Sequence, residues 1–290
     1  MGKKCTVSIA MPVRNCERTI VAAIRSIVFQ SFLDWELLVI DDGSSDGTLA
    51  ILRQFNDPRI RIYSDGQSRG LPNRLNEAIV KANGQYFARM DGDDVSYPRR
   101  LDEQVAYLRA RPDIDLVGAG MMIFDDQGVV VGKRIPPVSH ELICRRPYSG
   151  FPVAHPSYCG RLEWFQIHGY SETATRCEDQ DLLLRSYQTS RFGNVPNILL
   201  GYREGALDLK KIIRSRYYFS QRIWLQARKA SEPISGLRGF LEQYVKGAID
   251  TIAVSAGLQR VLLRHRARPA TNDEIETWKQ VWYSLNIPRN

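Results

Sequence analysis

The sequence predicts an α/β protein with a doubly wound, mostly parallel sheet, helices on both faces of that sheet and a helical, basic C-terminal extension. Two observations predict this fold. Along the first 110 residues, short apolar runs typical of buried strands alternate with segments whose apolar residues recur at helical spacing. Residues 205–290 carry 15 Lys and Arg against 7 Asp and Glu, which accounts for the whole net charge of +8. We therefore expect one domain over residues 1–204 and a separate helical region over residues 205–290.

The expected elements follow one another along the first domain. Apolar residues that run together or alternate predict strands at Thr6–Pro12, Trp35–Ile40, Arg59–Tyr63, Gln85–Met90, Leu116–Val117 and Met121–Phe124. Helical spacing predicts helices after Asn15, after Asp46, and over Leu71–Ala82 and Leu101–Ala110. Asn83-Gly84 is a helix-ending signal.

Beyond residue 205 the sequence predicts helices with an excess of basic residues. One helix face carries the apolar residues Leu237, Leu241, Tyr244, Val245, Ala248, Ile249 and Ile252. Two interpretations remain open for this face. It packs on the first domain with the charges on its solvated back, or it lies with the neighbouring basic residues on an anionic membrane surface.

Composition favours an ordinary globular protein. Of the 290 residues, 43% are hydrophobic and 25% are charged, which are normal values. The N-terminus does not resemble a secretory signal, and no stretch approaches 18 uncharged apolar residues, so we expect neither secretion nor a membrane span. The five cysteines are scattered with no CxxC spacing, which predicts reduced thiols in a cytoplasmic protein rather than a zinc or redox site.

Two acidic clusters follow two of the expected strands. Asp42 belongs to an Asp-Asp-Gly-Ser sequence, and Asp91, Asp93 and Asp94 lie within four residues. Ligands bind beyond the carboxyl ends of strands in such sheets, so both clusters are expected in one cleft. Three close carboxylates repel one another, and Mg²⁺ or Mn²⁺ would compensate them. The alternative for each cluster is an ordinary turn: a solvated acidic loop, or a turn leading into a helix cap.

Four segments then resemble the successive motifs of family 2 inverting glycosyltransferases, which have the GT-A fold. The segments are VSIAMPVRN at 7–15, LLVIDDGSSDGT at 37–48, ARMDGDD at 88–94 and EDQDLLLR at 178–185. Residues 68–105 and the sequence HPSYCGRLEWF at 155–165 also resemble the subgroup that builds bacterial exopolysaccharide and O-antigen repeats. The resemblance covers roughly residues 5–204, and four motifs in order are far more specific than one.

The resemblance implies roles for the residues that bind the donor. Pro12 and Val13 would lie against the nucleotide base, and Asp42 would bind uracil. Asp91 would face the ribose or sugar, and Asp93 would bind the metal that bridges the diphosphate.

The resemblance also implies a catalytic base, Asp179, which would remove the proton of the acceptor hydroxyl. His155 would contact the diphosphate or complete the metal shell; a buried structural histidine is the alternative. The chain departs from the family pattern at Arg14, where tyrosine is usual, and at Gly160, where a bulky apolar residue is common.

These features predict a metal-dependent inverting glycosyltransferase that moves a sugar from a nucleoside diphosphate-sugar, favouring UDP, to a saccharide hydroxyl. The subgroup implies an acceptor linked to polyprenyl diphosphate and a peripheral position on the inner face of the plasma membrane. A sugar-nucleotidyltransferase is the main alternative, but the first expected strand is not followed by a Gly-rich, basic loop. A non-catalytic nucleotide- or nucleic-acid-binding protein is the other, and no nucleic-acid-binding motif supports it.

Overall fold

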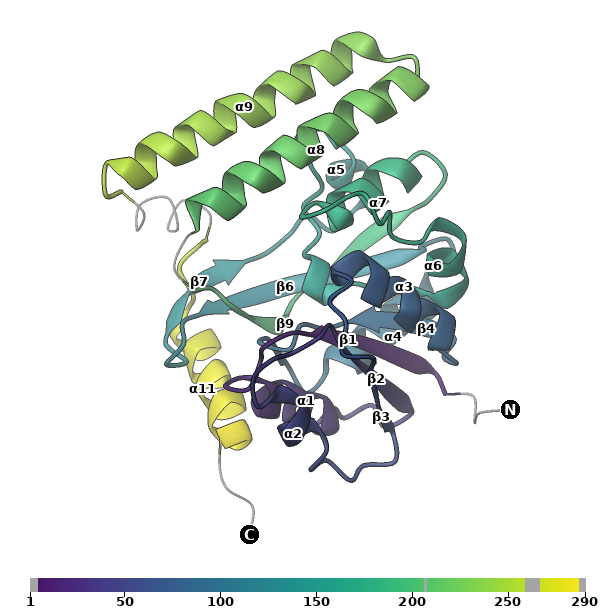
Figure 1. The fold of residues 1–290 in the computed structure, drawn as a ribbon, viewed down its shortest axis with the longest axis vertical. Coiled ribbons are helices and arrows are strands. Elements are labelled where there is room, and N and C mark those ends of the chain that lie inside the picture. The colour runs from purple at the N-terminus through teal and green to yellow at the C-terminus, as the bar shows by residue number, and fades with distance from the viewer. Residues whose placement is uncertain (1–4, 206–207, 259–266, 287–290) are drawn as a thin grey trace.

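A nine-stranded mixed sheet forms the centre of the molecule (Figure 1). The structure is a computed structural model that describes residues 5–205, 208–258 and 267–286. The strand order is β3-β2-β1-β4-β8-β6-β9-β5, with β7 paired to β6. The strands are β1 (Val7–Val13), β2 (Trp35–Asp41), β3 (Ile60–Ser64), β4 (Tyr86–Arg89), β5 (Val95–Ser96), β6 (Leu116–Phe124), β7 (Val130–Arg134), β8 (Cys159–Arg161) and β9 (Phe192–Arg203).

Strands β3, β2, β1 and β4 are parallel, as are β6 and β9. Strand β8 runs antiparallel between β4 and β6 and joins the two parallel parts. The expected parallel arrangement is therefore confirmed for the N-terminal half, which places the carboxyl ends of β1, β2 and β4 at one edge.

Helices cover both faces of the sheet, as predicted. One apolar core lies under α1 (Ile20–Val28), α2 (Thr48–Leu52) and α4 (Arg100–Ala110). The core on the other face lies under α3 (Leu71–Lys81), α6 (Leu162–His168) and α7 (Glu178–Ser186). Short helical segments, α5 (His140–Ile143), η1 (Pro147–Ser149) and η2 (His155–Ser157), connect the later strands.

The C-terminal region is helical, as expected, but it occupies two places. Helices α8 (Leu209–Lys229) and α9 (Pro233–Ser255) form an antiparallel hairpin at one end of the molecule (Figure 1). Helix α11 (Asn272–Asn286) instead returns to the sheet, where Trp278 is fully buried against Phe124. The domain boundary at residue 204 stays a prediction, and in space the basic region is not one unit.

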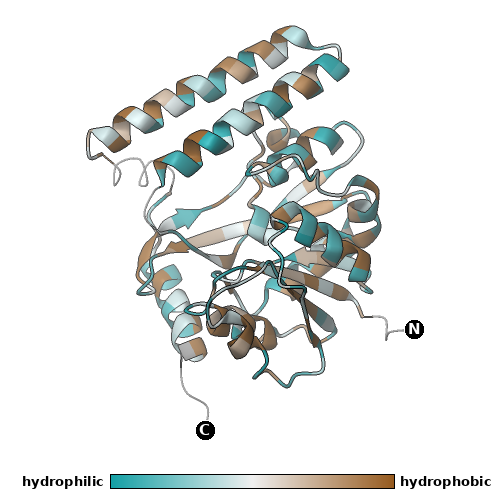
Figure 2. Ribbon diagram, viewed as in Figure 1, coloured by the Kyte–Doolittle hydropathy of each residue, from teal (hydrophilic) through white to brown (hydrophobic). Residues whose placement is uncertain are grey.

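The apolar face predicted on α9 points to solvent. Leu241, Val245 and Ile252 are 52%, 59% and 68% exposed, and Figure 2 shows hydrophobic residues along this helix. The buried side of α9 consists of small and polar residues, namely Gly236, Gly239, Gln243, Gly247 and Asp250. A Cβ on Gly239 would lie 2.5 Å from the Cβ of Tyr148, so the close approach of α9 requires these small residues. The interpretation that the apolar face packs on the catalytic domain is therefore wrong for this structure.

None of the described helices combines the length and the apolar character needed to cross a bilayer.

Candidate functional site

The ends of β1, β2 and β4 bring the predicted donor-binding residues together. Val13 pairs with Asp41 in the sheet, and the backbone N–H of Met90 donates to the Ala10 carbonyl at 2.9 Å, which carries the acidic loop past β1. A Cβ on Gly92 would lie 2.9 Å from Val13 Cγ1, so this loop packs directly on β1. Both acidic clusters thus lie at one sheet edge, as the strand pattern predicts.

A cavity of about 520 Å³ opens at this edge, and we call it the donor cavity. Pro12, Val13 and Asp42 line it, as does Arg14. The segment 69–73 and the segment 172–178 form its remaining walls. Its volume lies in the usual range for small-molecule sites.

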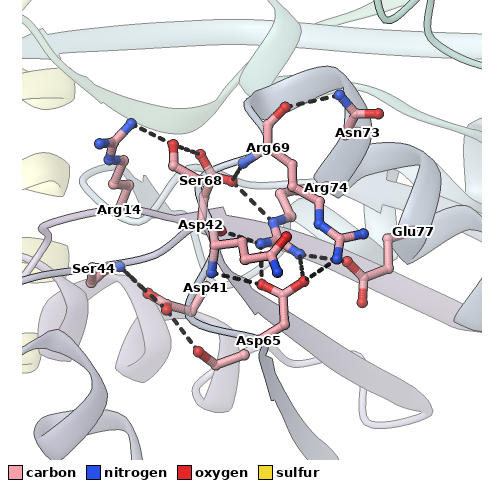
Figure 3. Close-up of polar contacts among 12 residues, drawn as sticks. Arg14, Asp41, Asp42, Ser44, Asp65, Ser68, Arg69, Asn73, Arg74 and Glu77 are labelled. Carbon is pink, nitrogen blue, oxygen red and sulfur yellow. Dashed lines mark hydrogen bonds and ion pairs between the residues drawn. The ribbon is translucent and has the colours of Figure 1, made fainter.

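Asp42 is held by a dense set of donors (Figure 3). Its Oδ1 accepts hydrogen bonds from the N–H groups of Arg69 (2.6 Å) and Gly70 (3.0 Å) and from Arg74 Nε (3.0 Å). Its Oδ2 accepts from the Ser68 hydroxyl at 3.2 Å and from Gly70 at 3.1 Å. Few lone pairs remain, so the contacts of Asp42 in this structure fix the loop that lines the donor cavity.

Arg74 is the centre of this network, and the sequence analysis does not select it. Its side chain is 1% exposed and pairs with Asp42, Asp65 (2.6 Å) and Glu77 (2.9 Å) (Figure 3). Asp65 hydrogen bonding raises the pKa of Arg74 above its ordinary value, although burial opposes the shift. A fixed, planar cation with five donors suits such a set of carboxylates. The sequence does mark Arg74 in one way, because it is an arginine on the apolar face of a predicted helix.

Asp91, Asp93 and Asp94 place carboxylate oxygens within 4.8 Å of one another. Asp94 is buried: its Oδ1 accepts from Arg203 N at 2.9 Å, and its Oδ2 has no hydrogen-bond partner in the part of the chain that the structure describes. Desolvation, followed by the charge of Asp91, raises the pKa of Asp93 to about 6. Desolvation raises the pKa of Asp94 as well. An all-carboxylate set with an unpartnered oxygen fits a hard divalent cation such as Mg²⁺ or Mn²⁺.

Arg89 is a second buried arginine that the sequence analysis does not select. It lies at the end of β4 and pairs with Asp91 Oδ1. Burial opposes its charge, but Asp91, Asp94 and Glu178 raise its pKa. The signal in the sequence was a charged residue inside an otherwise buried strand.

His155 lies outside the acidic group. Its Nε2 shares a 3.0 Å hydrogen bond with the Tyr170 hydroxyl. Burial, with the positive charge of Arg89, lowers the pKa of His155 well below its ordinary value. The ring is thus neutral and tied to Tyr170, while its role as a metal or diphosphate ligand stays a prediction.

Asp179 lies in the first turn of α7, where the helix dipole favours a carboxylate. Its Oδ2 accepts from Gln180 Nε2 at 3.2 Å, and burial raises its pKa. The neighbouring Glu178 lines the donor cavity, and burial followed by the charge of Asp179 raises its pKa to about 7. Both carboxylates therefore have the raised pKa that suits a general base.

Asp181, the last acid of the same turn, is fully buried and has a different part. It pairs with Arg185 at 2.8 Å and with Arg222 of α8 at 3.6 Å. The Asp181–Arg222 pair joins the helix that carries Asp179 to the α8–α9 hairpin.

The two departures from the family pattern have local explanations. Arg14 lines the donor cavity and donates to the Ser68 hydroxyl at 2.7 Å. Gly160 lies in β8, where a Cβ would meet the Asp115 carbonyl oxygen at 2.6 Å, so no side chain fits between β4 and β6.

Comparisons with known proteins identify relatives of this chain. Residues 8–166 match the family model described as Glycosyl transferase family 2. The chain is 37% identical over 212 residues to the Bacillus subtilis protein named as the glycosyltransferase EpsE, covering 71% of this chain and 75% of that one. It is 34% identical over 131 residues, 45% of this chain and 51% of the relative, to the Escherichia coli UDP-Glc:alpha-D-GlcNAc-diphosphoundecaprenol beta-1,3-glucosyltransferase WfgD.

Solved structures share the fold at low sequence identity. Residues 1–349 of S. aureus TarS, in complex with UDP-GlcNAc, align with a TM-score of 0.62 at 20% identity, over 96% of this chain and 91% of that fragment. The mannosyltransferase PcManGT of Pyrobaculum calidifontis, in complex with GDP-Man and Mn²⁺, aligns with a TM-score of 0.61 at 18% identity, over 98% and 85%. The predicted GT-A type of fold is confirmed.

We expect Arg74→Met to lower both stability and nucleotide binding. Removing one partner of a buried ion pair costs about 3–5 kcal/mol, and the loop held by Asp42 lines the donor cavity. Chemical denaturation and UDP titration measure the two effects. Arg99→Met is the control, because this 76% exposed side chain makes only a 3.8 Å pair with Glu103, a type worth about 0–1 kcal/mol. Equal stability of the two variants would contradict the assigned part of Arg74.

Proposed function

The chain belongs to Glycosyl transferase family 2 and is a glycosyltransferase, and we propose that it transfers a sugar from a UDP-sugar to a saccharide hydroxyl with inversion at the anomeric carbon. One observation carries the proposal: the acidic group and the donor cavity lie together where β1, β2 and β4 end. A nucleoside diphosphate needs both a base pocket and compensation of its negative charge, and this edge of the sheet offers both.

We assign the nucleotide to the donor cavity, with Pro12 and Val13 against the base and Asp42 at the uracil edge. The complexes of TarS with UDP and UDP-GlcNAc and of PcManGT with GDP-Man support a nucleotide-sugar donor for this fold. The name of WfgD supports UDP among nucleotides.

Asp91 and Asp93, with the neighbouring Asp94, would hold Mn²⁺ or Mg²⁺. A cation bound there would compensate the charge that the leaving diphosphate gains as the bond to the sugar C1 breaks. Asp179 would accept the proton of the acceptor hydroxyl while that oxygen forms its bond to C1. Attack opposite the leaving group in one displacement inverts the anomeric centre.

The acceptor is proposed to be a saccharide linked to polyprenyl diphosphate, in assembly of bacterial cell-surface polysaccharide. The names of WfgD, with its diphosphoundecaprenol acceptor, and of the Escherichia coli O-antigen biosynthesis glycosyltransferase WbnJ support this class. Such an acceptor lies in a membrane, and we propose that the α8–α9 hairpin rests peripherally on the cytoplasmic membrane face. The exposed apolar residues of α9 and the basic residues of α8 suit an interface with anionic lipid.

Asp93→Ala is expected to lose Mn²⁺-dependent binding of the UDP-sugar and, with it, transfer. Loss of a residue that only supports a metal ligand lowers metal affinity by about 10–100-fold. Loss of a ligand itself is expected to lower it by at least as much. Calorimetric titration of UDP with and without Mn²⁺ measures this. Asp126→Ala is the matched control, since Asp126 is 78% exposed in a nearby turn. Intact metal dependence in Asp93→Ala would refute the assignment.

Asp179→Asn is expected to keep nearly normal UDP-sugar affinity while turnover falls by about 10²–10⁴-fold, because a general base acts only on the acceptor proton. Steady-state kinetics and donor titration separate the two quantities. Glu178→Gln is the comparison variant, since it removes a charge one residue away and keeps the side-chain shape. If Glu178→Gln loses turnover and Asp179→Asn keeps it, Glu178 is the base instead.

The membrane proposal is tested by flotation of the full-length chain with anionic vesicles at low salt. The triple change Leu241→Ser, Val245→Ser and Ile249→Ser is expected to reduce flotation about tenfold or more, since burying one such side chain is worth about 1.5–3 kcal/mol. The control changes three exposed apolar residues elsewhere to serine: Leu33, Val80 and Ile167. Equal flotation of the two triple variants would remove the proposed contact.

A further inference from the structure

Three cavities follow one another from the donor site to the hairpin. The donor cavity shares Arg176 and Glu178 with a second cavity of about 560 Å³. That second cavity shares Arg216 and Gln243 with a third, of about 490 Å³. The shared walls make the three cavities adjacent, and each has a different chemical character.

The second cavity is suited to an anion. Arg176 has no side-chain partner among the described residues, and its φ of +63° holds it in the left-handed region that non-glycine residues rarely adopt. Among the described residues, Lys211, also in the wall, makes a single exposed pair, with Asp208 at 3.8 Å. Both cations are thus available for a ligand, and Glu178, at the side of the donor cavity, is the one acid that the described residues contribute to the lining.

Gln243 supplies an independent indication of a ligand. The residue is 3% exposed, and its Oε1 accepts from Arg216 Nη1 at 3.4 Å. Its Nε2 is buried and has no hydrogen-bond partner in the described structure. An unpaired buried donor is costly, and an oxygen of a bound anion would satisfy it.

The third cavity lies between α8 and α9 and is mainly apolar. Ile213, Tyr217, Tyr244 and Ala248 line it. Arg214 and Arg216 lie at its wall as well, and no acidic residue of the described chain takes part. The absence of a side chain at Gly247 keeps the two helices close beneath it, since a Cβ there would lie 3.3 Å from Ile213 Cδ1. A flexible hydrocarbon chain matches such a groove in shape and polarity.

We propose that these cavities form one acceptor track for a sugar linked to prenyl diphosphate, an inference that rests on the proposed glycosyl transfer. The acceptor sugar lies beside Glu178 and Asp179. The diphosphate binds Arg176, Lys211 and the Gln243 Nε2–H group. The first isoprenoid units lie between α8 and α9. The acceptor presents its groups in the same order as the cavities: the sugar at the donor cavity, the diphosphate in the second cavity and the prenyl chain in the third.

Farnesyl diphosphate is the probe, titrated into the full-length protein with UDP and Mn²⁺ at saturation so that the donor cavity is occupied. Two variants alter separate parts of the track. Gln243→Glu replaces the free donor with an acceptor oxygen, and Ala248→Trp fills the groove. Each is expected to weaken farnesyl diphosphate binding about tenfold or more, as loss of a charge-assisted contact or of a buried apolar chain implies.

Matched controls and fragments of the probe complete the test. Gln226→Glu and Ser235→Trp make the same changes on α8 and α9 away from the three cavities, and they are expected to bind normally. Inorganic diphosphate should bind weakly, with the same affinity for Ala248→Trp as for the unmodified protein. Farnesol should also bind weakly, with an affinity that Gln243→Glu does not change. Thermal melting of each variant verifies that it is folded.

Wild-type affinity in both track variants, or no binding of farnesyl diphosphate by the unmodified protein, would overturn the acceptor track. The track would also be overturned if the protein bound anionic vesicles but not farnesyl diphosphate. That result would indicate a surface for lipid headgroups instead. The donor titration keeps the two proposals distinguishable. Normal UDP binding without farnesyl diphosphate binding removes the track alone, whereas absent UDP binding removes the proposed donor site.

Discussion

Two buried arginines hold together the carboxylates on which this structure depends. Arg74 compensates Asp42, Asp65 and Glu77, and Arg89 compensates Asp91. Without these cations the carboxylates would repel one another, protonate or move apart, because charge is poorly solvated at a sheet edge. One buried oxygen of the acidic loop, Asp94 Oδ2, has no hydrogen-bond partner among the described residues. The site is therefore stable enough to form and still has capacity for a cation.

The sequence predicts the N-terminal half of the sheet well, because each strand there is a local apolar run. The predicted strands at 6–12, 35–40, 59–63 and 85–90 agree with β1 to β4 within one residue at most ends. Strand β6 is continuous where two strands are predicted, since Gly118 and Gly120 interrupt the apolar pattern. Those glycines are needed for close contacts, and a Cβ on Gly118 would lie 2.4 Å from Asn194 Oδ1. Strands β5, β8 and β9 depend on distant partners, which no local pattern reveals.

The same distinction applies to the site. The strand ends predict that Asp42 and the acidic loop lie at one end of the sheet, and both do lie against Val13 there. The motifs do not reveal Arg74, Arg89 or the position of Glu178 between two cavities, because these follow from contacts across the fold. Helical periodicity finds the apolar face of α9 but cannot tell whether that face turns inward. The ion pair between Arg216 of α8 and the buried Asp250 of α9, at 2.6 Å, helps to hold the polar side of α9 inward and so its apolar face outward.

The contact between Asp181 and Arg222 has a mechanical consequence. Asp181 lies two residues after Asp179 in the same turn, and Arg222 is an interior residue of the 21-residue helix α8. A long helix acts as a lever, so a small tilt of the hairpin moves its ends far and its centre little. The proposed base is fastened near that pivot. Were α8 to tilt about this contact, the turn that carries Asp179 would move less than the outer ends of the hairpin.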